Sequence, residues 1–151
     1  MIEELLNKPY RIIDILPEQV PEGSAGQYFA VERYWQQPPA FAEIRRRFTG
    51  ILLKLNCYSD FRVCFAGSEE YTLNPAPELL ASWILDGQKD LCILLPGEDA
   101  LITLNRDDTW MTLYQPSETL LRRTERLASA EGLFVWKPDE SGDKSAETEN
   151  R

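Results

Sequence analysis

The chain has 151 residues, of which 43% are hydrophobic and 27% are charged, as in an ordinary globular domain. Its net charge of −9 repels phosphate backbones and anionic lipid surfaces, so we expect neither nucleic acid nor a membrane as a partner. The absence of histidine excludes Ser-His-Asp and Cys-His catalysis and most catalytic zinc sites, which makes an enzyme the less favoured class.

The first third of the chain favours two strands. Residues 2–7 suit a short helical turn before Pro9, because the residue before a proline is biased away from the helix. The β-branched residues of Tyr10–Leu16, which lies between two prolines, favour a strand. An exposed loop rich in glycine and proline follows, and aromatic residues then favour a second strand over Gln27–Trp35.

A helix is predicted to begin at Pro38 and Pro39 and to stop at Gly50. The arginines of Arg45–Arg47 are consecutive, so on a helix they fan around more than half of its surface and cannot all hold one phosphate. Such a charge run favours a solvated face over a binding site. The continuation Ile51–Tyr58 fits both helical and strand spacing, and we assign it to a strand.

The second half of the chain has the clearest pattern. After a short strand at Phe61–Phe65, a helix is predicted over Pro75–Asp86, with Asn74 as its N-cap. Three strand segments follow with turn residues between them: Leu91–Leu95, Ala100–Leu104 and Thr109–Tyr114. Ser117 then caps a last helix that ends near Ala130, and Leu133–Trp136 forms a closing strand.

This order of elements predicts an α+β fold. We expect a mostly antiparallel or mixed sheet that includes a meander in the C-terminal half, with about three helices packed against it. Residues 1–136 form the single globular domain in this prediction. Residues 137–151 hold five acidic and three basic residues but no large apolar residue, so we expect a disordered acidic tail there.

The chain ends and the cysteines bear on location and chemistry. The N-terminus lacks the basic start and apolar stretch of a secretion signal, which favours a cytoplasmic protein. The three cysteines, Cys57, Cys64 and Cys92, form no close pair in the sequence, so we expect neither a disulfide framework nor a metal site, and no cofactor. An alternative hypothesis is a small-molecule binding protein or histidine-free enzyme with a pocket near Cys57, although a packed cysteine is favoured.

The aromatic residues point to the leading functional hypothesis. Tyr34 and Trp35 are consecutive, so on a strand their side chains would lie on opposite faces, and one of them would leave the core side. Trp110, Tyr114 and Trp136 would extend an aromatic surface, which typically contacts a partner, unless a helical layer covers it. We therefore predict a non-enzymatic protein-interaction domain that binds another protein or a second copy around Tyr34, Trp35 and Trp110.

Four runs of residues carry a resemblance to a protein family. They are Pro9–Pro17, Gly26–Phe29, Leu55–Tyr58 and Gly132–Pro138. In these runs, and over most of residues 1–138, the chain is similar to a set of small hypothetical proteins from anaerobic gut bacteria. That family brings no assigned activity, cofactor or catalytic residue, so the resemblance implies only a bacterial, cytosolic setting.

Overall fold

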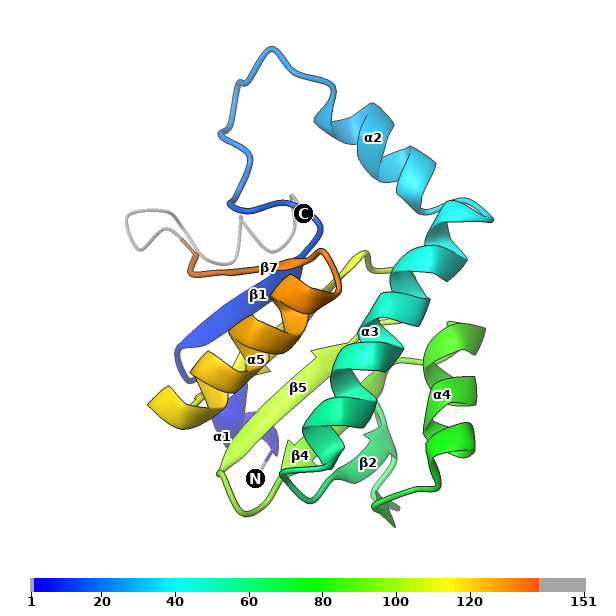
Figure 1. Ribbon diagram of the computed structural model, residues 1–151, viewed down its shortest axis with the longest axis vertical. Helices are drawn as coiled ribbons and strands as arrows, with labels where there is room; N and C mark the ends of the chain where they lie inside the picture. The colour runs from blue at the N-terminus through cyan, green and yellow to red at the C-terminus, as the bar shows by residue number, and fades with distance from the viewer. Residues whose placement is uncertain (1, 139–151) are drawn as a thin grey trace.

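The computed structural model describes residues 2–138 and shows one antiparallel sheet of seven strands with five helices in this part of the chain (Figure 1). The elements in chain order are α1 (Ile2–Leu5), β1 (Tyr10–Asp14), α2 (Tyr28–Trp35), α3 (Ala40–Asn56), β2 (Arg62–Phe65), β3 (Thr72–Leu73), α4 (Pro77–Asp86), β4 (Leu91–Leu95), β5 (Ala100–Leu104), β6 (Trp110–Tyr114), α5 (Glu118–Ala130) and β7 (Phe134–Trp136). The predicted α+β class with an antiparallel sheet is confirmed. The predicted tail lies outside the described residues from position 139 onward.

The sheet has the strand order β3-β2-β4-β5-β6-β1-β7, with the predicted meander β4-β5-β6 at its centre. Ile93 of β4 lies opposite Ile102 of β5, and Ile102 lies opposite Leu113 of β6. All three side chains are fully buried. This row of aliphatic residues places the core against the centre of the sheet.

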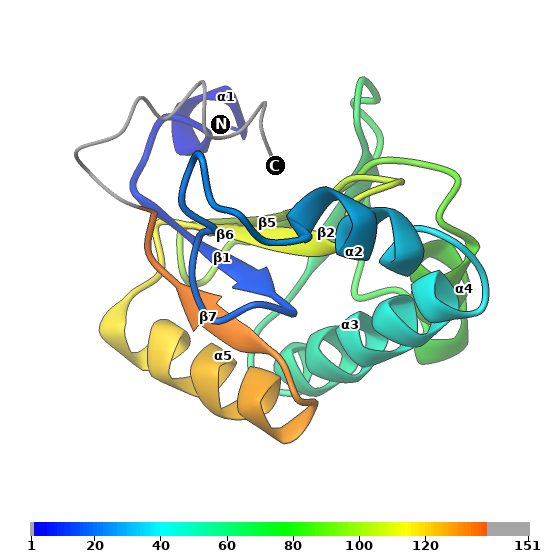
Figure 2. The same cartoon turned by 90° about the horizontal axis from the view of Figure 1, so that it is seen from above.

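Three helices cover one face of the sheet, while α1 lies on the opposite side (Figure 2). The three covering helices are α3, α4 and α5, and α3 packs against both of the others. The predicted cap of α5 is confirmed, because the Ser117 hydroxyl accepts a hydrogen bond from the backbone N–H of Leu120 at 3.1 Å. Leu120, Thr124 and Ala128 form the buried side of this helix, as its helical spacing predicts.

Helix α3 does not stop at Gly50, and the strand predicted over Ile51–Tyr58 is wrong. The helix continues to Asn56 and buries Ile51 and Leu55 completely. Gly50 lies inside this helix, and the flexible carboxylate of Glu131, just after α5, occupies the space beside it. The glycine therefore does not mark the end of the helix.

The strand predicted over Gln27–Trp35 is also wrong, because this segment forms α2. Strand β1 already has β6 on one side and β7 on the other, so no sheet edge is free beside it. Local contacts favour the helix: the N–H of Val31 donates to the carbonyl of Gln27 at 2.9 Å, and the Tyr28 hydroxyl donates to the Glu32 carboxylate at 3.0 Å. In Figure 1, α2 lies beyond the end of the sheet and leads into α3.

Helix α4 begins at Pro77, two residues later than predicted, and Asn74 does not cap it. The Asn74 side chain instead accepts a hydrogen bond from the N–H of Phe61 at 2.8 Å and donates to Asp60 at 3.0 Å. A side chain that holds the backbone before β2 is not available as a helix cap. Asn74 thus ties the start of β2 to the segment that leads into α4.

A fully buried arginine joins α3 to the turn between β5 and β6. The Nη2 group of Arg45 donates hydrogen bonds to the carbonyl oxygens of Asn105 at 2.5 Å, Arg106 at 2.9 Å and Asp108 at 3.4 Å. Its guanidinium also lies over the ring of Phe41, 4.8 Å from the centroid. The interpretation of the three arginines as one solvated face is therefore wrong for Arg45.

Burying this cation has an electrostatic cost that nearby acidic residues partly offset. Burial lowers the pKa of Arg45 to about 10, while Asp108, Asp107 and Asp90 act in the opposite direction. The guanidinium remains protonated at neutral pH, so its hydrogen bonds to the turn are charge-assisted. The Nε and Nη1 groups have no hydrogen-bond acceptor among the described residues.

Replacing Arg45 by methionine should destabilise the fold much more than the same change at its neighbour. We expect R45M to lower the free energy of unfolding by about 2–4 kcal/mol, because three turn carbonyls lose a charged donor. R46M is the matched control, since the Arg46 side chain is 65% exposed, and its effect should stay within about 1 kcal/mol. Urea unfolding of both variants measures the difference, and equal effects would contradict this role of Arg45.

Candidate functional site

The face of the sheet opposite α3, α4 and α5, here called the second face, carries a continuous row of directly opposed residues. From β2 to β7 the row consists of Cys64, Cys92, Thr103, Thr112, Ile12 and Trp136. Opposed residues of an antiparallel sheet have Cβ atoms about 4.5–5.5 Å apart, so neighbouring side chains in this row can interact. The polar members lie together on the β2, β4, β5 and β6 part of the sheet.

The thiols and hydroxyls of this part of the second face affect one another electrostatically. Burial raises the pKa of the Tyr114 phenol, and Thr103 and Thr112 partly counter that effect. Burial also raises the pKa of Cys92 to about 11, with smaller contributions from Cys64. At neutral pH these groups are therefore uncharged, so the cluster can exchange hydrogen bonds but holds little thiolate for attack on a substrate.

Three aromatic residues that we expected on one surface do lie on the second face. Trp110, Tyr114 and Trp136 occupy alternate positions of β6 and the end of β7, and the ring of Tyr10 lies 5.5 Å from that of Tyr114. Trp110 lies directly opposite Asp14, which is almost fully buried and accepts a hydrogen bond from the Trp136 indole at 3.3 Å. Trp110 itself is half-buried.

Tyr34 and Trp35 do not lie on the sheet with Trp110, because they belong to α2. Tyr34 is 65% exposed, whereas Trp35 is half-buried and packs against the core. Their rings meet edge to face, with centroids 5.7 Å apart. The structure therefore separates the predicted contact residues into two places, the exposed side of α2 and the second face of the sheet.

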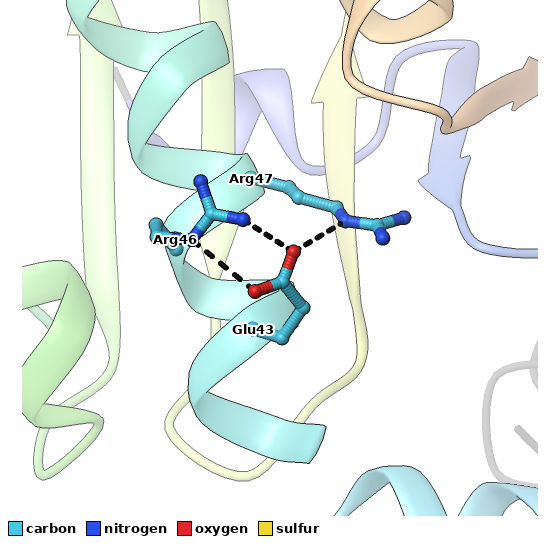
Figure 3. A network of polar contacts seen from close by, with 3 residues as sticks. All are labelled: Glu43, Arg46 and Arg47. Atoms are coloured by element: carbon cyan, nitrogen blue, oxygen red, sulfur yellow. Dashed lines mark hydrogen bonds and ion pairs between the residues drawn. The ribbon is translucent and has the colours of Figure 1, made fainter. Parts of the chain in front are cut away.

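Arg46 and Arg47, the other two arginines of the triplet, both contact the carboxylate of Glu43 (Figure 3). Arg46 forms an ion pair with Glu43, and the Nε group of Arg47 lies 3.2 Å from the same carboxylate. The hydrogen bond from Arg46, and then that from Arg47, lowers the pKa of Glu43. With Arg45 buried at the turn, the triplet does not form a free cationic cluster for an anion.

Cys57 is exposed just after the last residue of α3, so the prediction of a packed cysteine is wrong, and its polar neighbours have other partners. The Asn56 amide donates to the carbonyl of Ser59 at 3.0 Å, and the Tyr58 ring lies under the Arg123 guanidinium at 4.3 Å. These contacts leave neither neighbour directed at the thiol. The pocket near Cys57 stays a prediction without a supporting contact.

Metal binding finds no support in the part of the chain that the structure describes, where no group of three or more carboxylate or thiol side chains is placed to hold an ion. Within residues 2–138, no helix is long and apolar enough to cross a membrane.

Comparisons of the chain with protein-family models, with curated proteins and with solved structures found no match. The resemblance to proteins of gut bacteria therefore stays a prediction.

The position of Cys64 directly opposite Cys92 is the feature of the site that the sequence analysis did not predict. The two cysteines belong to strands that are adjacent in the sheet but separated in the chain by β3 and α4. Their positions show no Cys-x-x-Cys spacing or other local signal. Only the order of strands in the sheet brings them together.

The raised pKa of Cys92 predicts a loss of stability at alkaline pH. The folded chain holds this proton more tightly than the unfolded chain, so the resulting stabilisation is present below pH 9 and is lost as the pH rises toward 11. We expect the free energy of unfolding under reducing conditions to fall over this range, and to fall less in C92A. Urea unfolding at a series of pH values measures both slopes, and identical slopes would show that Cys92 does not contribute.

Proposed function

We propose that the protein is a non-enzymatic protein-interaction domain whose partner binds the outer side of α2. One observation carries the proposal: none of the eight residues of α2, all of which the structure describes, is buried. Phe29 is 66% exposed, Val31 43% and Tyr34 65%, so the helix presents large apolar side chains to the surface. Exposed apolar residues gathered on one element are typical of a contact surface.

The packing of α2 supports this role. A helix of eight residues is too short to be stable in water by itself, and its contacts with the rest of the protein are mainly with α3. Trp35 packs against the core and meets the Tyr34 ring edge to face, so it attaches the helix to the protein while Tyr34 stays exposed. Tyrosine is among the residues that contribute most to binding energy when a partner desolvates it.

The charge of the chain indicates the chemistry of the partner. The net charge of −9 favours association with a basic protein and opposes association with a second copy. Val31 and Tyr34 lie three residues apart and so share one side of this short helix, and together with the exposed Phe29 they suit a hydrophobic groove that takes up the helix. We therefore propose a different protein that presents an apolar groove flanked by lysine or arginine. Trp110, on the second face, stays a predicted contact residue outside this surface.

The test compares two changes on α2 with a matched change elsewhere. Partners are first captured with the tagged protein from cells in which it occurs, and each recovered protein is then titrated against purified variants. We expect F29S/Y34S to weaken binding by about tenfold or more, because two apolar contacts are lost. Y58S is the control, since Tyr58 is 64% exposed but lies at the other end of α3, and it should leave the Kd within about twofold.

Two other outcomes would contradict the proposal. Equal binding of wild type and F29S/Y34S by every recovered partner would overturn the proposal. Sedimentation of the purified protein tests the second occupant: a dimer that F29S/Y34S dissociates and Y58S retains would show that α2 binds another copy of the chain instead. Circular dichroism of each variant checks that the fold is intact.

A further inference from the structure

Cys64 and Cys92 occupy directly opposed positions of the adjacent antiparallel strands β2 and β4. Both are free thiols on the second face, and their side chains interact with each other. We propose that this pair is a modification site at which a small-molecule disulfide, such as glutathione disulfide, produces a reversible cross-strand disulfide bond.

The register of the two strands determines how well such a bond fits. The N–H of Ala66 donates to the carbonyl of Asp90 at 2.9 Å, so these opposed residues form a hydrogen-bonded pair of the ladder. Hydrogen-bonded pairs alternate along antiparallel strands, which makes Cys64 and Cys92, two positions further along each strand, a pair of the same kind. The Cα atoms of such pairs lie about 5.5 Å apart, within the usual range for disulfides.

The same register makes the bond readily reversible. Cβ atoms of hydrogen-bonded pairs lie near the upper end of about 4.5–5.5 Å, whereas disulfides prefer about 3.5–4.5 Å. Closing the bond therefore pulls the two strands together locally, and such strain makes a disulfide easier to reduce. A bond of this kind forms only in an oxidising thiol pool and opens again when reduced thiols return.

The exchange proceeds in two balanced steps. Cys92 is half-buried and Cys64 is 8% exposed, so Cys92 is the sulfur that an oxidant reaches first. Its thiolate attacks glutathione disulfide, forming a mixed disulfide and releasing one glutathione. The thiolate of Cys64 then attacks the Cys92 sulfur and releases the second glutathione, while the two thiol protons pass through solvent to the released glutathiones. Two protein thiols are oxidised and one small disulfide is reduced to two thiols.

Oxidation changes the edge of the sheet. Strand β2 has only β4 and the two-residue strand β3 as neighbours. A bond between Cys64 and Cys92 closes a loop that contains β3 and α4, and it prevents β2 from separating from β4. The oxidised protein should therefore protect the β2 amides from hydrogen exchange more strongly than the reduced protein does.

The experiment uses the full chain with C57S, which removes the exposed third thiol and leaves the pair untouched. The protein is incubated with glutathione disulfide, alkylated, and analysed by mass spectrometry with peptide mapping. We expect both thiols to disappear together, with a mass loss of two hydrogens, a linked peptide pair that contains Cys64 and Cys92, and complete reversal by dithiothreitol. C57S/C64S and C57S/C92S are the matched controls and should gain at most one glutathione.

The pH dependence provides a second readout in the same protein. Because burial raises the pKa of both thiols, the thiolate fraction near neutral pH is small and grows about tenfold per pH unit. Formation of the bond should accelerate accordingly until Cys92 titrates. Glutathione adducts on C57S without the internal bond, or a linked peptide that appears only after unfolding in urea, would overturn the proposal.

Discussion

The hydrogen bonds of the buried Arg45 to the turn between β5 and β6 hold the helical layer in register with the sheet. Apolar contacts along α3 have no preferred direction, whereas a guanidinium that donates to the carbonyls of Asn105 and Arg106 must meet both oxygens at hydrogen-bond distance. The same turn leads into β6, and α3 follows directly after α2. The placement of α2 and of Trp110 at the start of β6 therefore depends on this contact.

Because α3, α4 and α5 cover only one face of the sheet, the two faces carry different types of side chain. The helix side is aliphatic, as in the row Ile93, Ile102 and Leu113. The second face combines thiols, hydroxyls, aromatic rings and the buried Asp14, and burial raises the pKa of Cys92 and of Tyr114 further above neutral pH. The thiols and the phenol of this face are therefore suited to exchanging hydrogen bonds at neutral pH.

The sequence correctly predicted those elements whose hydrophobic spacing and flanking residues fit only a helix or only a strand. The meander and α5 follow from short apolar runs between turn residues and from a serine cap, and both are confirmed. The errors arose at residue types that occur in two kinds of local structure. Gly50 suggests a helix end but lies inside α3, and the aromatic residues of Gln27–Trp35 suggest a strand but form α2, because β6 and β7 already occupy both sides of β1. The burial of Ile51 and Leu55 in the core decided the first error, and the contacts within α2 decided the second.

The positions of the proposed contact residues and of the cysteine pair depend on contacts between residues distant in the chain, more than the elements of the fold do. Tyr34 was a reasonable candidate from its sequence, but its exposure follows from the position of α2 beyond the end of the sheet, which no local pattern encodes. Arg45 and Arg46 are adjacent and chemically identical, yet one is buried and the other exposed because only one faces the turn. The opposition of Cys64 and Cys92 requires β2 beside β4 in one register, and a slip of one residue would place the two sulfurs on opposite faces.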